Sequence, residues 1–128
     1  MNIVDTSGWI EYFFAGRNAS YFVKPIEQTQ ALIVPVICLY EVFKKVNIVA
    51  DEAKALQAIA QMKQGRIISI TEEIALKAAL NSIKYKLPMA DSLIYAAGQV
   101  EGAIVWTQDE HFENLPGVNY KKSFTQGK

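Results

Sequence analysis

The chain has 128 residues, of which 51% are hydrophobic and 20% are charged, so its composition fits one globular domain and excludes a disordered chain. Its 13 basic and 13 acidic residues cancel, which excludes nucleic-acid binding by bulk positive charge and leaves only local, weak or metal-assisted binding. No apolar run approaches the ~20 residues that cross a bilayer, and the first residues lack the basic and apolar regions of a signal peptide. We therefore expect a cytoplasmic protein without a membrane contact.

The single cysteine, Cys38, has apolar neighbours and is predicted to be a buried thiol.

Apolar runs and helical periodicity divide the chain into alternating strands and helices. In chain order the pattern predicts a strand at 2–5, helices at 7–14 and 20–28, a strand at 31–34, helices at 36–49 and 51–63, a strand at 66–70, helices at 71–85 and 90–100, a strand at 103–106, a helical turn at 109–115 and an edge strand at 118–120. Pro25 either interrupts or starts the second helix. This alternation predicts an α/β fold with a central parallel sheet and helices on both faces. We assign residues 1–120 to the domain and expect residues 121–128 to form a polar tail.

Two acidic residues lie at or just beyond the carboxyl ends of predicted strands. Asp5 is the last residue of the first strand, and Asp109 follows the fourth. In a parallel sheet the carboxyl ends of the strands form the edge at which ligands bind, so both positions are candidates for a site. Aspartate also caps helices well, and each residue could be the N-cap of the helix that follows. The sequence alone leaves both interpretations open.

Two further acids lie in predicted helices. Glu41 belongs to a helix that is otherwise apolar nearly all round, where a buried carboxylate requires a metal or a base as its partner. The alternative is a single solvated position on a buried helix. Asp91 lies in the first turn of the helix after Pro88, where the helix dipole favours an acid whether or not it has a function.

The combination of these four acids is more informative than any one of them. A parallel sheet can bring all four to one edge, where their charges would repel one another unless they were neutralised. Clustered carboxylate oxygens suit the hard divalent ions Mg²⁺ and Mn²⁺. Such a site implies hydrolysis of phosphodiester bonds, because a bound divalent ion activates water and stabilises the leaving oxygen.

Three stretches of the sequence, at residues 3–10, at 34–42, and at 87–94 together with 104–112, resemble the PIN-domain family, and in particular VapC-type toxins of type II toxin–antitoxin pairs. The resemblance extends from about residue 3 to residue 120 and implies a single PIN-like domain that cleaves RNA with Mg²⁺ or Mn²⁺. It further implies a homodimer and a cognate antitoxin whose C-terminal segment blocks the acidic site. By resemblance, the catalytic and metal-binding residues are Asp5, Glu41, Asp91 and Asp109, with Thr6, Ser7 and Thr107 as supporting polar residues.

The sequence departs from the family pattern at one place. The helix that carries Glu41 begins with Val36 and Ile37, where the family often has serine or threonine, so we expect a polar contact near Glu41 to be absent.

Two other functions remain open at this point. Asp5 could be the nucleophile of a phosphatase or phosphotransfer enzyme, although the sequence lacks a second aspartate two residues later. The chain could also be a non-catalytic binding module on the same fold.

His111, the only histidine, is either a general base or a solvated residue on a short helix. The early aromatic residues, among them Trp9 and Phe13, either stack on RNA bases or pack in the core or a dimer surface.

Overall fold

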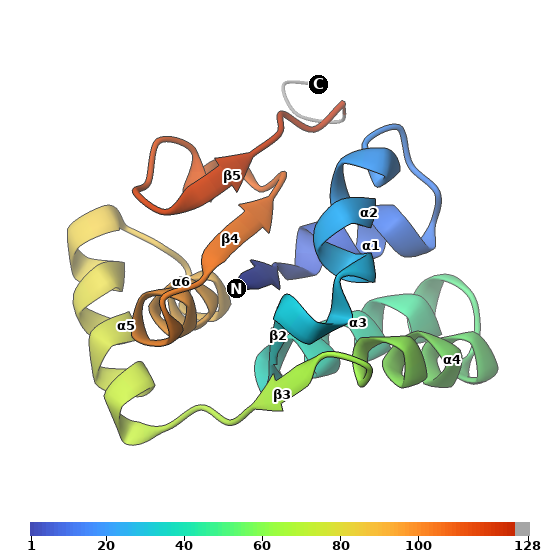
Figure 1. Ribbon diagram of the computed structural model, residues 1–128, viewed down its shortest axis with the longest axis horizontal. Helices are drawn as coiled ribbons and strands as arrows, with labels where there is room; N and C mark the ends of the chain where they lie inside the picture. Colours follow the sequence, from blue (N-terminus) through green and yellow to red (C-terminus); the bar gives the residue numbers. More distant parts are fainter. Residues whose placement is uncertain (125–128) are drawn as a thin grey trace.

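The computed structural model describes residues 1–124 and contains a five-stranded, entirely parallel sheet (Figure 1). The strand order is β3-β2-β1-β4-β5, which places β1 at the centre of the sheet. Strand β5 lies at one edge, as the sequence predicted. The strands are β1 (Asn2–Val4), β2 (Leu32–Pro35), β3 (Arg66–Ile68), β4 (Ile104–Thr107) and β5 (Val118–Tyr120).

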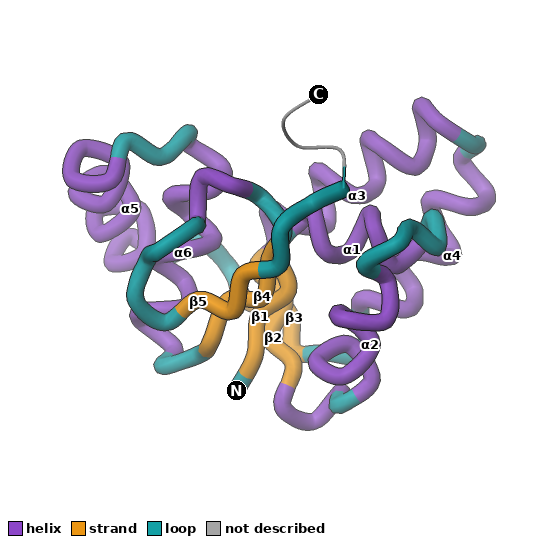
Figure 2. Tube along the Cα trace, turned by 90° about the horizontal axis from the view of Figure 1, so that it is seen from above, coloured by secondary structure: helices purple, strands orange, loops and turns teal. Residues whose placement is uncertain are grey.

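Helices cover both faces of this sheet. Figure 2 shows the strands between α5 and α6 on one side and α1, α2 and α4 on the other. The predicted α/β architecture is therefore confirmed. The helices are α1 (Thr6–Phe13), α2 (Ala19–Glu27), α3 (Val36–Val49), α4 (Glu52–Met62), α5 (Glu72–Tyr85) and α6 (Met89–Glu101), with short 3₁₀ turns η1 (Thr29–Ala31) and η2 (Glu110–Phe112).

Helix boundaries follow the capping chemistry of the sequence. The side chains of Asp51 and Thr71 accept hydrogen bonds from the backbone N–H groups that open α4 and α5. Gly102 adopts a left-handed conformation, with φ of 66°, and ends α6. Helix α2 runs through Pro25 without interruption, because Pro25 lies in its last turn and removes only one backbone donor there.

Strand β3 is shorter than the sequence predicted and ends at Ile68 instead of residue 70. Its neighbour in the sheet is β2, and the last aligned pair is Pro35 with Ile68. Pro35 is also the N-cap of α3, so the chain leaves the sheet there and β3 has no partner beyond this point.

The core lies between the sheet and its helices. Trp9 is fully buried and stacks on Phe13 at 5.6 Å, so these aromatic residues serve packing. The buried thiol predicted for Cys38 is confirmed. Gly8 allows α1 to lie close to α2, because a Cβ at this position would be 2.7 Å from the ring of Phe22.

The first residues of the expected polar tail lie along the domain. The Lys121 N–H donates to the Thr107 carbonyl at 3.0 Å, and the Asn18 side chain donates to the Lys122 carbonyl at 3.0 Å. The part of the expected tail from 125 to 128 lies outside the described residues. None of the helices within residues 1–124 is both long enough and apolar enough to cross a membrane.

Candidate active site

Asp5 and Asp109 lie at the carboxyl edge of two neighbouring strands at the centre of the sheet. Strands β1 and β4 pair in parallel, with Val4 opposite Trp106, and the backbone N–H of Asp5 continues this ladder by donating to the Trp106 carbonyl at 3.0 Å. The chain therefore brings together two acids that are separated by more than a hundred residues in sequence. The sequence predicted this position for both acids, because each one lies where a strand ends.

The Asp5 carboxylate is buried and held by three donors. Its Oδ1 accepts hydrogen bonds from the Ser7 hydroxyl at 2.7 Å and from the Gly8 N–H at 3.1 Å. Its Oδ2 accepts a hydrogen bond from the Thr107 hydroxyl at 2.8 Å. Asp5 is thus both the N-cap of α1 and a member of the site, so the two interpretations left open by the sequence are compatible.

Asp109 also combines both interpretations. It is the N-cap of η2, where its Oδ1 accepts a hydrogen bond from the His111 N–H at 2.9 Å. Its own N–H donates to the Thr107 hydroxyl at 2.9 Å, and the same hydroxyl donates to Asp5. Thr107 therefore links the two strand-end carboxylates and fixes their relative position.

Glu41 and Asp91 reach the site from helices α3 and α6. The Glu41 carboxylate accepts a hydrogen bond from the Thr6 hydroxyl. Thr6, from the start of α1, therefore supplies a polar contact to Glu41, although the start of α3 at Val36 and Ile37 is apolar as expected. Asp91 occupies the first turn of α6, as predicted from its position after Pro88.

All four acids line one cavity of about 520 Å³. The supporting residues Thr6 and Ser7 line the same cavity, whereas Thr107 is fully buried and contacts it only through its hydrogen bond to Asp5. The cavity is also lined by Lys44, Lys45, Tyr40, Ile48 and Gln108.

Negative charge is concentrated in this cavity. Burial raises the pKa of Asp5 to about 7 from its usual 3.8, against the opposing effect of its hydrogen bonds. Burial also raises the pKa of Asp91, and the neighbouring carboxylates of Asp109, Asp5 and Glu41 raise it further. Within residues 1–124, no lysine or arginine forms an ion pair with any of these four acids. Among the described residues, the geometry therefore supplies a set of carboxylate oxygens that only the His111 ring, and no lysine or arginine, contacts as an ion pair.

A family model for the PIN domain matches residues 3–118. The chain belongs to the PIN domain family. No curated protein matches the sequence. Among solved structures, this PIN domain is similar to a chain from a toxin–antitoxin complex of Klebsiella pneumoniae, with 23% identity, a TM-score of 0.78 and coverage of 93% of this chain and 96% of that chain.

Two further solved structures have the same fold. One is a VapC toxin of Mycobacterium tuberculosis that cleaves the sarcin–ricin loop, with 17% identity, a TM-score of 0.74 and coverage of 88% of this chain and 92% of that one. The other is DNA-bound VapBC from Salmonella typhimurium, with 14% identity, a TM-score of 0.75 and coverage of 95% and 98% of the two chains. The chain thus shares its fold with structures of VapC-type toxins, the group that the sequence resembles.

Two further residues of this PIN domain site, Gln108 and His111, lie where the sequence contains little or no indication of a role. Gln108 lines the cavity and donates its side-chain amide to Glu11 at 3.1 Å, and its position between Thr107 and Asp109 was the only signal for it. His111 was expected to be either a general base or a solvated residue. Its side chain is 49% exposed, yet the ring Nδ1 lies 2.7 Å from Asp109 and 3.4 Å from Asp91.

Proposed function

We propose that this PIN domain is a metal-dependent endoribonuclease and the toxin of a toxin–antitoxin pair. The observation that carries the proposal is the single cavity lined by Asp5, Glu41, Asp91 and Asp109 at the carboxyl edge of the sheet. The family match and the similarity in fold to a VapC toxin that cleaves the sarcin–ricin loop support this reaction class. We also infer that the protein acts in the cytoplasm, where its RNA substrate is found.

The donor set fits a hard divalent ion. Asp5, Glu41, Asp91 and Asp109 offer carboxylate oxygens, and the raised pKa of Asp5 reflects a buried charge that a cation would stabilise. These residues would hold Mg²⁺ or Mn²⁺, which activates water and stabilises the leaving oxygen when it is bound.

The remaining polar residues of the cavity position this machinery and the substrate. Thr6 and Thr107 orient the Glu41 and Asp5 carboxylates through hydrogen bonds. Lys44 and Lys45 lie on the rim, where their ammonium groups would contact the phosphates of an RNA strand. This local placement of positive charge accounts for RNA binding by a chain whose net charge is zero.

The buried setting of Asp5 argues against its use as a nucleophile. Its side chain is almost fully buried, and both oxygens already accept hydrogen bonds. A phosphotransfer mechanism would need one of these oxygens to be free to attack phosphorus.

The test of the proposed function is cleavage of a mixed RNA pool by the purified chain with Mg²⁺, with Mn²⁺ and with EDTA. We expect the chain to cleave RNA when Mg²⁺ or Mn²⁺ is present and not when EDTA is present. The rate of cleavage by Asp109→Asn should be lower by at least about a hundredfold, which is typical when a group that stabilises the transition state is removed. Asp51→Asn is the matched control, because this exposed aspartate caps α4 and does not line the cavity. Cleavage by Asp109→Asn at the rate of the wild type would exclude the proposed site. Metal binding without cleavage of any RNA would favour a binding module.

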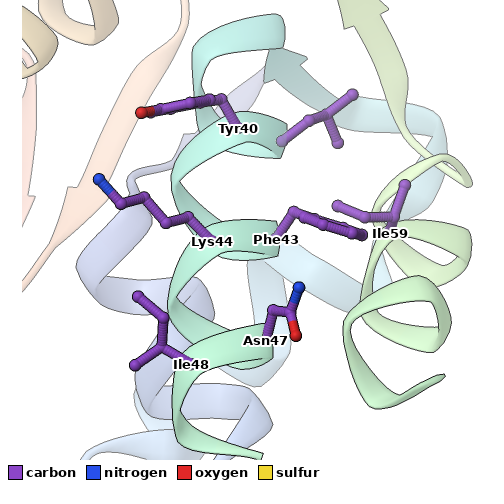
Figure 3. Close-up of a pocket in the computed structure, with 7 residues that line it drawn as sticks. Tyr40, Phe43, Lys44, Asn47, Ile48 and Ile59 are labelled. Carbon is purple, nitrogen blue, oxygen red and sulfur yellow. The ribbon is translucent and has the colours of Figure 1, made fainter. Parts of the chain in front are cut away.

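We propose that the antitoxin lies in an apolar groove beside the acidic cavity. Figure 3 shows Tyr40, Lys44 and Ile48 along one side of α3, with Phe43 pointing towards Ile59 of α4. The groove has a volume of about 500 Å³, and Tyr40, Lys44 and Ile48 also line the acidic cavity. A segment lying in this groove would therefore reach the carboxylates and block them.

The groove can be tested without altering the acidic cavity. Asn47 lines the groove but does not line the cavity, and its side chain is exposed. Asn47→Arg is expected to weaken inhibition by the co-expressed antitoxin and to leave RNA cleavage unchanged. Full inhibition of this variant would place the antitoxin elsewhere.

A second copy of the chain is proposed to cover an apolar stripe on α5. Leu76, Leu80 and Ile83 follow helical spacing and are 62%, 67% and 77% exposed. Acidic Glu72 begins this helix and basic Lys84 lies in its last turn, so an antiparallel second copy would place opposite charges together. Light scattering, which measures the mass of the protein in solution, tests this proposal. The Leu80→Lys variant is expected to be monomeric. The matched control is Leu56→Lys, which changes an exposed leucine of α4 and is expected to remain dimeric. A dimeric Leu80→Lys variant would exclude this interface.

A further inference from the structure

His111 directs a ring nitrogen at the acidic cavity although half of its side chain is exposed. The ring Nδ1 lies 2.7 Å from Asp109 Oδ1 and 3.4 Å from Asp91 Oδ2. One ligand atom from each of these three residues falls within 4.8 Å of the others. The histidine therefore adds a nitrogen donor to a site that otherwise offers only carboxylate oxygens.

The separations match the spacing of ligands around one ion. In octahedral coordination with bonds of about 2.1 Å, neighbouring ligand atoms lie about 3 Å apart, because the bonds meet at right angles. The two distances from His111 Nδ1, 2.7 Å and 3.4 Å, lie on either side of this value.

The local backbone fixes His111 in this position. Asp109 caps η2, and its Oδ1 accepts the His111 backbone N–H at 2.9 Å, so the two residues are held on one short turn. The next residue, Phe112, is fully buried and anchors the turn to the core. Asp109 and His111 are thus arranged as a chelating pair, with Asp91 facing them from α6.

We propose that His111 is a ligand of the metal ion in this site and that its imidazole makes the site prefer Mn²⁺ to Mg²⁺. The inference rests on the proposed function, because it requires that the carboxylates bind a divalent ion. Mg²⁺ binds oxygen ligands almost exclusively, whereas transition-metal ions accept imidazole nitrogen readily. One nitrogen among carboxylates therefore stabilises bound Mn²⁺ more than bound Mg²⁺.

Pulsed electron paramagnetic resonance of Mn²⁺ bound to the full chain tests this ligand directly. His111 is the only histidine in the sequence, so labelling histidine with ¹⁵N changes the nitrogen coupling of one residue alone. We expect a directly bonded nitrogen in the wild type, a changed coupling after labelling, and no such coupling in His111→Ala. This readout is independent of cleavage.

Calorimetric titration of the same proteins measures the selectivity. His111→Ala is expected to bind Mn²⁺ about tenfold more weakly and to change Mg²⁺ affinity about twofold or less. Glu113→Ala, at the exposed end of the same turn, is the matched control and is expected to keep the affinities of the wild type for both ions.

Each other outcome overturns the proposal in a different way. If Mn²⁺ binds to the wild type without nitrogen coupling, His111 only orients Asp109, and the proposed function still stands. Equal losses of Mn²⁺ and Mg²⁺ affinity in His111→Ala would overturn the selectivity. If neither ion binds to the wild type, both the ligand assignment and the metal-dependent function are wrong.

Discussion

Replacing Asp5 with asparagine is expected to stabilise the metal-free protein at neutral and alkaline pH. The Asp5 side chain is 2% exposed and its pKa is raised to about 7, mainly by burial. Asparagine has the same shape, cannot ionise, and retains an oxygen that accepts the Gly8 N–H. The substitution therefore removes a buried charge and preserves the cap of α1.

The sign and size of the effect follow from proton linkage. Between about pH 4 and pH 7 Asp5 is ionised in the unfolded chain but holds its proton in the folded protein. The folded state then binds more protons, so the free energy of unfolding falls as pH rises, and the loss is complete above pH 7. The shift is about three pKa units at 1.36 kcal/mol each, which gives about 4 kcal/mol. We expect Asp5→Asn to exceed the wild type by about this amount near pH 8 and to match it near pH 4.

Urea unfolding in EDTA, at a series of pH values from about 4 to 8, measures this difference. Asp51→Asn is the matched control, because it also replaces an aspartate that caps a helix, but one that is exposed and not buried. A gap between Asp5→Asn and the wild type that stays constant across the series would refute the reasoning. Saturating Mn²⁺ should narrow the gap, because it stabilises only the protein that keeps the full set of ligands.

Three further changes test the packing and hydrogen bonds that position the site. Gly8→Ala places a Cβ 2.7 Å from the ring of Phe22 and should lower the free energy of unfolding by about 1–3 kcal/mol in urea titrations. Asn18→Ala removes two side-chain hydrogen bonds from a buried residue and should cost about 1–3 kcal/mol in the same assay. Thr107→Val removes the hydroxyl that donates to Asp5 Oδ2, so the pKa of Asp5 should rise further and the loss of stability should extend to higher pH. An unchanged pH profile for this variant would contradict the role given to Thr107.

The sequence predicted the strand-end part of the site because that part depends on one simple rule. Asp5 and Asp109 each follow a buried strand, and parallel strands bring their carboxyl ends to one edge. The alternation of strands and helices was sufficient to predict the sheet and its two covered faces. It was not sufficient to predict the end of β3 at Ile68, which depends on where the partner strand leaves the sheet at Pro35.

The contacts that join separate elements could not be predicted from spacing. The bond from Thr6 to Glu41 requires a particular rotation of α3 against the start of α1, which tertiary packing decides. The direction of the His111 ring depends on the geometry of a three-residue turn. The apolar start of α3 at Val36 led to the expectation that Glu41 lacks a polar contact, and this expectation was wrong, because Thr6 donates a hydrogen bond to it from elsewhere in the chain.

The hydrogen bond between Thr107 and Asp5 has a consequence for synthesis of the chain on the ribosome. It joins residues 102 positions apart, and Asp91 and Asp109 also belong to the last third of the sequence. A nascent polypeptide that ends before these residues has Asp5 and Glu41 but cannot assemble the cavity. With the proposed site, translation products that end before Asp91 are therefore expected to lack nuclease activity.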